Sequence, residues 1–236
     1  MKNIGENNIV VAIDGAAASG KSTTARLVAN SLGFNYLDTG AMYRAAALAA
    51  KISNADTDDE NSVVSTVEMS NLKVECSSTD MKIFIDGEEV SEQIRTDAVS
   101  ELTSIISAFP NVRKLMVKMQ RALVTGKNFV VEGRDIGTVV FPDAEFKFFL
   151  TASAEERAKR RFEETNSNQN STTIEEVENE MKKRDLRDST RATSPLKKAE
   201  DAVELDTTEM TIDEQVKHLT RVIQMEIQKE SQVYAG

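Results

Sequence analysis

The stretch Ile9-Val-Val-Ala-Ile-Asp-Gly-Ala-Ala-Ala-Ser-Gly-Lys-Ser22 decides the fold of this chain. Its apolar start, residues 9–13, predicts a buried parallel strand, and the residues from Lys21 to about Leu32 predict a helix. Between them, residues 15–22 match the pattern Gly-x-x-x-x-Gly-Lys-Ser, in which glycines let several backbone N–H groups point at one anion. A strand, a glycine loop and a helix in this order predict a phosphate-binding loop, or P-loop.

The P-loop predicts how the chain holds a nucleotide. The Lys21 ammonium should reach the β- and γ-phosphates and assist catalysis, and the Ser22 hydroxyl should bind the Mg²⁺ that accompanies ATP. Mg²⁺ is therefore the expected cofactor, with Ser22 as its protein ligand. The residues expected to bind ATP are Gly15, Ala16, Ala17, Ala18, Ser19, Gly20, Lys21, Ser22 and Thr23.

The composition argues against several classes of protein. The chain has 236 residues and a formal net charge of −10, whereas a nucleic-acid or anionic-membrane partner would require a basic surface. One cysteine (Cys76) and one histidine (His218) rule out an intrachain disulfide and a zinc site of the Cys/His type. The apolar run 9–13 is too short for a secretory signal or a membrane span, so we expect a cytoplasmic protein.

Strand and helix patterns alternate along the chain, which predicts an α/β fold with a parallel sheet flanked by helices. Residues 53–62 are acidic and polar and predict a loop. Two runs with period-two alternation, Leu72–Cys76 and Met81–Ile85, predict an antiparallel hairpin in an inserted subdomain. The strands predicted for the main sheet lie near residues 9–13, 35–37, 129–132, 146–150 and 202–206.

Two capping-box patterns, Ser153-x-x-Glu156 and Thr211-x-x-Glu214, predict the starts of two helices. The polar residues 165–173 predict a mobile loop between two charged helices. The last helix should bury an apolar face made of Val216, Leu219, Val222, Ile223 and Ile227.

Arginine clusters in three places of this acidic chain. One such cluster is most simply a solvated helix face with local ion pairs, but three clusters beside a P-loop favour phosphate binding. Phosphoryl transfer between nucleotides brings several phosphate charges together, and an ionised acceptor phosphate needs no general base. Arginine forks bind phosphate oxygens bidentately. The clusters are Arg134 with Asp135, the set Arg157, Arg160 and Arg161, and the helically spaced set Arg184, Arg187, Asp188 and Arg191.

These residues alone leave more than one function open. No Asn/Thr-Lys-x-Asp motif for recognising guanine is present, which argues against a GTPase. A small P-loop kinase and a nucleotide-gated binding protein without chemistry both fit the P-loop. The arginine clusters favour the kinase, because a binding switch leaves them unexplained.

Nearly the whole chain, from Ile9 to about Glu226, resembles bacterial cytidylate kinases. Thr39 stands where a serine is common, which keeps the hydroxyl, and Ala16 and Ala17 replace the more usual Pro-Ser of the loop, where the backbone does the binding. The matches beyond the P-loop are Leu37-Asp-Thr-Gly-Ala-Met-Tyr-Arg44, Ser104, Phe109-Pro-x-Val-Arg113, Glu132-Gly-Arg-Asp-Ile-Gly-Thr-Val-Val-Phe-Pro142 and Arg184-Asp-x-Arg-Asp-x-x-Arg-Ala192.

The resemblance implies phosphoryl transfer from ATP to CMP or dCMP, in pyrimidine nucleotide metabolism. It leaves the preference between CMP and dCMP, and the tolerance for UMP, undetermined. Related kinases for adenylate or thymidylate are the alternative within enzymes, and the β-rich insertion and the Gly-Arg-Asp-Ile-Gly-Thr run argue against them. The residues that the resemblance assigns to CMP are Thr39, Arg44, Ser104, Arg113, Arg134, Asp135, Arg184, Asp188 and Arg191.

The resemblance also implies a role for each group. Three arginines hold the acceptor phosphate: Arg44, Arg134 and Arg184. Three residues face the cytosine: Ser104, Arg113 and Asp135. Asp188 and Arg191 lie near the ribose and the phosphates. Arg157, Arg160 and Arg161 belong to a lid over ATP, and Arg160 or Arg161 contacts the transition state.

The implied organisation is a single kinase domain over residues 1–236, which we expect to be a monomer. Its inserted subdomain spans approximately residues 65–95 and its lid approximately residues 157–191. The core comprises approximately residues 1–64, 96–156 and 192–236.

Three carboxylates keep two interpretations each. Asp135 can accept a hydrogen bond from the amino group of cytosine, or it can simply pair with Arg134 or Arg113. Glu132 and Asp14 can each orient Mg²⁺ through water, or cap a turn.

Overall fold

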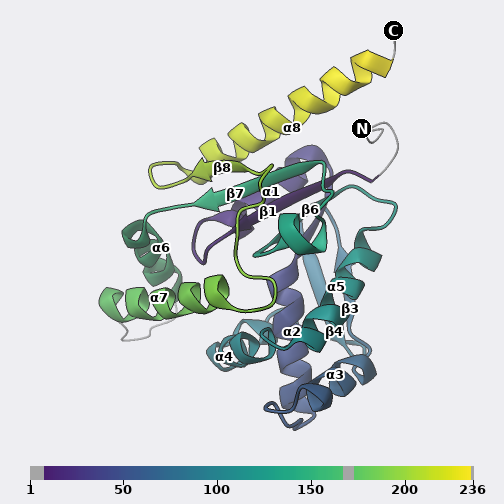
Figure 1. Cartoon of the computed structure of the whole chain (residues 1–236), viewed down its shortest axis with the longest axis vertical. Helices are drawn as coiled ribbons and strands as arrows, with labels where there is room; N and C mark the ends of the chain where they lie inside the picture. The colour runs from purple at the N-terminus through teal and green to yellow at the C-terminus, as the bar shows by residue number, and fades with distance from the viewer. Residues whose placement is uncertain (1–7, 167–172, 235–236) are drawn as a thin grey trace.

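The fold of the protein is seen in a computed structural model that describes residues 8–166 and 173–234 (Figure 1). A five-stranded sheet forms its centre, and every neighbouring pair of strands in it is parallel, as predicted. In spatial order the strands are β2 (Asn35–Asp38), β6 (Phe129–Gly133), β1 (Val10–Gly15), β7 (Phe146–Thr151) and β8 (Val203–Asp206).

Helices cover both faces of this sheet, which explains why its central strands β1 and β6 are buried along their whole length (Figure 1). Val11 and Ile13 of β1 pack in one core with α1 (Lys21–Leu32) and α8 (Ile212–Tyr234). Val10 and Ala12 belong to the other core, with α2 (Thr39–Ile52) and α5 (Pro110–Val124). The period of two along the strand thus divides its side chains between two hydrophobic layers.

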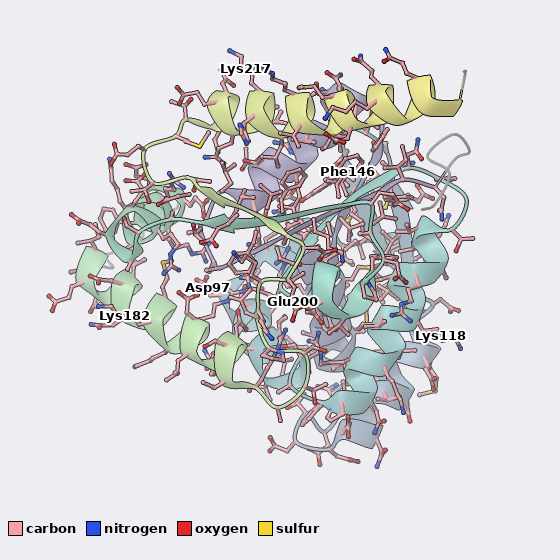
Figure 2. All side chains as sticks on the ribbon, turned by 45° about the horizontal axis from the view of Figure 1, so that its top comes forward. Asp97, Lys118, Phe146, Lys182, Glu200 and Lys217 are labelled. Atoms are coloured by element: carbon pink, nitrogen blue, oxygen red, sulfur yellow. The ribbon has the colours of Figure 1, made fainter. Side chains whose placement is uncertain are left out.

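The helix α8 begins with the predicted capping box. The Thr211 hydroxyl accepts from the Glu214 amide at 3.3 Å, and the Glu214 carboxylate accepts from the Thr211 amide at 2.8 Å. Its predicted apolar face is confirmed, with Leu219 and Ile223 fully buried. Figure 2 shows Lys217 on the opposite side of α8, pointing away from the molecule, and Phe146 of β7 beneath the helix.

The chain between β2 and β6, the second and third strands of the main sheet in sequence, forms a separate layer below it (Figure 1). The predicted hairpin is confirmed as an antiparallel pair, and a short third strand joins it after a turn at Gly87, whose φ is 88°. The elements in order are α3 (Glu60–Met69), β3 (Lys73–Cys76), β4 (Met81–Ile85), β5 (Glu88–Glu89), η1 (Gln93–Arg95) and α4 (Asp97–Ile106).

The loop predicted over residues 53–62 was wrong in its last part, because α3 already begins at Glu60. The acidic residues that suggested a loop instead start the helix: the Asp59 side chain accepts from the Asn61 amide, and Glu60 lies in the positive first turn. Val63 and Val67 then bury the inner face of α3.

This layer is bonded to the outer edge of the main sheet. The Tyr36 amide of β2 donates to the Ser77 carbonyl at 2.8 Å. The Asp38 amide approaches the Met81 sulfur at 3.2 Å. The edge strand β2 therefore has partners on both sides.

Two charged helices, α6 (Ala154–Asn166) and α7 (Ile174–Thr190), lie side by side beyond the end of β7 (Figure 1). The Ser153 hydroxyl accepts from the Glu156 amide, which is one half of the predicted capping box. Most of the loop predicted over 165–173 falls at residues 167–172, outside the described residues. Within the described ranges, no helix is long and apolar enough to cross a membrane.

Candidate active site

The site lies where β1, β2 and β6 end, because the carboxyl ends of parallel strands meet at one edge of the sheet. The P-loop begins at the end of β1, Asp38 ends β2 and is followed by Thr39, and Arg134 and Asp135 follow β6. The register of the strands sets these positions side by side: Asp14 pairs with Gly133, and Asp38 with Glu132.

The P-loop has the backbone that its glycines predict. A Cβ on Gly15 would lie 2.3 Å from the Leu150 carbonyl oxygen, so only glycine fits there. Gly20 has a φ of 84° and directly precedes α1, whose N-terminus faces the loop. Ala18 is also left-handed, with a φ of 56°. The phosphate-binding interpretation thus rests on a close backbone approach and two left-handed residues.

Lys21 is almost fully buried within the loop. Its ammonium donates to the Ala16 carbonyl at 3.2 Å and lies 3.9 Å from the Glu132 carboxylate. Burial and the cations of Arg134 and Arg184 together lower the pKa of Lys21 to about 8, against the attraction of Glu132. Bound phosphate would supply the negative charge that this crowded ammonium lacks.

Glu132 is a second buried charge behind the P-loop. Burial raises its pKa, as does the neighbouring Asp38, while Lys21 and a hydrogen bond from Ser22 oppose the rise. The Tyr36 hydroxyl also donates to Glu132 at 3.3 Å. The carboxylate therefore lies beside Ser22, the residue expected to bind Mg²⁺.

The three arginines expected at the acceptor phosphate come from three different elements and meet near Lys21. The Arg134 guanidinium donates to the Gly15 carbonyl and to Asp188, each at 2.9 Å, which binds it to the P-loop. Arg44 pairs with Asp38 at 2.8 Å. Arg184 stays exposed to solvent, but the protein around it and the nearby Arg134 cation lower its pKa to about 10.

Asp38 and Asp188 keep this cationic cluster together. Burial alone would raise both pKa values, but the arginines beside them outweigh it and the pKa of each carboxyl is lowered. Asp38 also caps α2 by accepting from the Ala41 amide at 2.8 Å. Two negative side chains thus position the positive ones without neutralising the site.

A buried ion pair marks the other end of the site. Arg113 of α5 pairs with Asp135, and both side chains are nearly inaccessible to solvent. Arg113 also donates to the Ser107 carbonyl at 3.2 Å and stands over the Tyr43 ring at 5.4 Å. Arg191 lies 4.0 Å from Asp135.

The other residues predicted to bind CMP lie around these two groups. The Thr39 hydroxyl, buried at the start of α2, donates to the Glu132 carbonyl at 2.8 Å. Ser104 is half-buried on α4, and Ser107, the residue that caps the C-terminus of this helix, accepts from Arg113. Arg191 follows α7 rather than lying on it, because the helix ends at Thr190.

The lid arginines differ from one another in their contacts. Arg157 bonds to the Ala17 carbonyl of the P-loop at 3.3 Å and to Asp185 at 2.5 Å. Arg160 donates twice to Thr207, at 3.1 and 2.7 Å, and Thr207 in turn donates to the Ser19 carbonyl. Arg161 is more exposed and pairs with Glu164 at 3.3 Å.

Sequence reasoning missed several residues that shape the site. Asp38 had a signal, because it immediately precedes an alanine-rich helix and is a residue type that favours the N-cap. Tyr43 and Asp185 stand next to residues that were chosen, Arg44 and Arg184, yet nothing in the sequence assigns them contacts. Thr207 meets the P-loop only through the fold.

A P-loop whose lysine faces clustered arginines at the open edge of a parallel sheet defines a P-loop kinase, an enzyme that transfers a phosphoryl group between anionic substrates. A family model described as cytidylate kinase matches residues 11–225, and this chain belongs to that family.

Curated relatives agree over most of the chain. A cytidylate kinase of Caldanaerobacter subterraneus subsp. tengcongensis is 48% identical over 215 residues, which cover 91% of this chain and 94% of the relative. One of Lactobacillus johnsonii is 44% identical and covers 95% and 98%. One of Carboxydothermus hydrogenoformans is 48% identical and covers 90% and 96%.

Proposed function

We propose that this protein transfers the γ-phosphoryl group of ATP to CMP or dCMP, giving ADP and CDP or dCDP, in pyrimidine nucleotide metabolism. The observation that carries the proposal is the meeting of Lys21 with Arg134 and Arg184 beside the buried Arg113–Asp135 pair. The three cations can bind the phosphates of both nucleotides. The Arg113–Asp135 pair can bind a base that presents one hydrogen-bond donor and two acceptors.

On the donor side, residues 15–23 bind the phosphates of ATP through backbone N–H groups and Lys21. Ser22 fits Mg²⁺, because its side chain is exposed at the end of the loop and bonded to the buried Glu132. Within the described ranges, no group of three or more acidic, Cys or His side chains could hold a metal, so the phosphates and water would supply the other ligands. The ion would shield the phosphate charge.

On the acceptor side, Arg44, Arg134 and Arg184 hold the CMP phosphate, and Asp188 and Arg191 lie near its ribose. The acceptor oxygen is already ionised, so the protein needs no general base and contributes position and positive charge.

For the base, Asp135 accepts from the amino group at cytosine N4, and Arg113 donates to N3 and O2, with Ser104 beside them. Their mutual ion pair supports this assignment, because it holds both side chains in a fixed orientation before the base arrives. Uracil has a carbonyl in place of the cytosine amino group, so it cannot donate this hydrogen bond to Asp135.

Of the two lid arginines, Arg161 is favoured for the transition-state contact. Its charge is near enough to Arg184 to lower the pKa of that group. Arg160 is held by Thr207 and Glu156, which suits an anchor between the lid and the P-loop. We further propose the core, insertion and lid boundaries given above, a monomer, and a cytoplasmic location.

The test is a product assay with Mg·ATP against CMP, dCMP, UMP, AMP and dTMP. We expect rapid formation of CDP and dCDP and weak activity on the others. Best activity on another monophosphate would keep the P-loop and the phosphate-binding arginines but reject the roles of Ser104, Arg113 and Asp135. ATP binding with no product from any acceptor would point to a nucleotide-gated binding protein.

A further inference from the structure

Asp14 is a buried carboxylate at the end of β1 that contacts no substrate group in the proposal above. Only 4% of its surface is exposed. Its two oxygens each accept one backbone N–H: Oδ1 from Ile136 and Oδ2 from Gly137, both at 2.8 Å. A carboxylate accepts only, so both of its oxygens are matched to donors here.

These two amides begin the helical turn η2 (Ile136–Val140), which directly follows Arg134 and Asp135. The far end of the same turn is also held by a charged side chain. Arg121 of α5 donates to the carbonyls of Val139 and Val140, at 2.9 and 2.8 Å. The turn that directly follows the acceptor-site residues is therefore hydrogen-bonded at both ends by charged side chains of other elements.

The segment that contains Arg134 is also hydrogen-bonded to the P-loop. The residue after Asp14 is Gly15, whose carbonyl accepts from Arg134 at 2.9 Å. Consecutive residues of β1 thus bind the acceptor-site segment through a side chain and through a backbone oxygen.

We propose that Asp14 is a positioning residue, which fixes Arg134 and Asp135 relative to the P-loop and so sets the distance between acceptor and donor nucleotides. This role rests on the proposed function. It assigns Asp14 to the turn and not to Mg²⁺. It also makes Arg121, on the surface of α5, a second support of the acceptor site.

The protonation state of Asp14 provides a second test of the proposal. Burial, opposed by the two backbone hydrogen bonds, raises the pKa of Asp14 to about 7 overall, and Asp135 and Arg134 are the charged groups that face it. Lys147 on β7 packs its stem near Gly137 but directs its ammonium to the Pro142 carbonyl and Asp201. Protonation below about pH 7 places a proton on one of the two acceptor oxygens.

The experiment compares the full-length wild type with Asp14→Asn, and with Asp143→Asn as a matched control on an exposed carboxylate. In Asp14→Asn one acceptor becomes an NH₂ group that faces a backbone N–H. We expect kcat/KM for CMP to fall at least about tenfold, while KM for ATP changes less than about twofold. The control should match the wild type.

The pH profile separates positioning from a general loss of structure. The ratio of wild-type to Asp14→Asn kcat/KM for CMP should grow as pH rises from about 6 to 8, because only the wild type gains its second acceptor. The titration of CMP itself cancels in this ratio. A flat ratio, or equal losses for ATP and CMP, would overturn the proposal.

Arg121→Gln provides a second route if circular dichroism shows that Asp14→Asn does not fold. It loosens the same turn from its other end, so KM for CMP should rise several-fold with KM for ATP unchanged. An unchanged KM for CMP would reject the proposal. A wild type that makes no CDP would instead reject the proposed function, which keeps the two failures distinct.

Discussion

At the scale of single residues, the buried pair Arg113–Asp135 contributes specificity rather than stability. When two charges are buried, the free energy of their attraction barely offsets the solvation free energy that they lose. An apolar pair of the same size would often be as stable. The pair keeps two hydrogen-bonding groups aligned in a site where an unmatched base leaves one of them without a partner. Discrimination between bases follows from that cost.

Asp135→Ala should lose the preference for CMP over UMP. The carboxylate accepts from the cytosine amino group but would face the O4 carbonyl of uracil, an unfavourable contact of about 1–3 kcal/mol. We expect kcat/KM for CMP to fall about tenfold or more, with the CMP/UMP ratio approaching one. Steady-state kinetics on both substrates measures this, with Asp143→Ala as control. Unchanged discrimination would reject the base-recognition role.

Asp38→Asn should lower the free energy of unfolding by about 1–2 kcal/mol at pH 7, because Arg44 loses a charged partner. The folded pKa of Asp38 is lowered below its ordinary value of 3.8, so this stability is present above that pH and is lost as pH falls through the folded pKa. Urea unfolding should therefore show a difference in the free energy of unfolding between the wild type and Asp38→Asn that is constant near neutral pH and disappears in acid. Asp58→Asn, which changes an exposed carboxylate, should leave the free energy of unfolding equal to that of the wild type.

The sequence predicted residues that belong to dense local motifs. The P-loop and the Gly-Arg-Asp-Ile-Gly-Thr run place their functional groups within a few positions of one another, so spacing alone carries the geometry. Asp14 kept two interpretations, because its partners Ile136 and Gly137 are more than a hundred positions away. Thr207 gave no signal for the same reason, since it meets Ser19 only after β8 has joined the sheet.

At the scale of elements, α8 and the helix of the P-loop are joined by a buried hydrogen bond. The Thr24 hydroxyl of α1 donates to Gln215 of α8 at 2.7 Å, and both side chains are fully buried. Gln215 also donates to the Met210 carbonyl at 3.2 Å and lies against Gly20. The last helix thus supports the P-loop from behind.

Gln215→Leu should destabilise the protein by about 1–3 kcal/mol, because the Thr24 hydroxyl and the Met210 carbonyl lose their partner in a dry interface. Combining it with Thr24→Val should cost less than the two single changes together, which a double-mutant cycle of denaturation measures. Gln224→Leu makes the same change on the exposed face of α8 and should be nearly neutral. Strict additivity in the cycle would contradict the coupling.

Elements were predictable where hydrophobic pattern and caps agreed. The five strands of the main sheet and the hairpin follow from apolar or alternating runs, and α8 follows from its capping box. The helices α3 and α4 were missed because their sequences are short and polar at the start, and their stability comes from packing against α2. Tertiary contacts, which no local pattern displays, decide such segments.

At the scale of the whole molecule, a chain with net charge −10 brings many of its arginines to one site. The lid helices and the inserted layer lie beyond the edges of the main sheet (Figure 1). The lid is connected to the P-loop through a few side chains: Arg157 contacts it directly, and Arg160 contacts it through Thr207. This arrangement suits closure around two nucleotides that excludes water from the transferred phosphoryl group.

Small-angle scattering should show a smaller radius of gyration when a bisubstrate analogue that joins ATP and CMP is added. The arginines from the core and the lid repel one another until phosphate lies between them, so ligand and closure should be coupled. ATP alone serves as the control and should give a smaller change. An identical radius with and without the bisubstrate analogue would contradict the motion.

The bond between Tyr36 and Ser77 has a consequence for self-association. An open sheet presents unpaired N–H and C=O groups at its edges, which invite pairing with another chain. Here the inserted hairpin occupies one edge, at β2, and the other edge strand, β8, is four residues long and carries Glu204 and Asp206. Deleting the hairpin should therefore leave a sheet that recruits further copies through β2, so that precipitation would precede any loss of the fold.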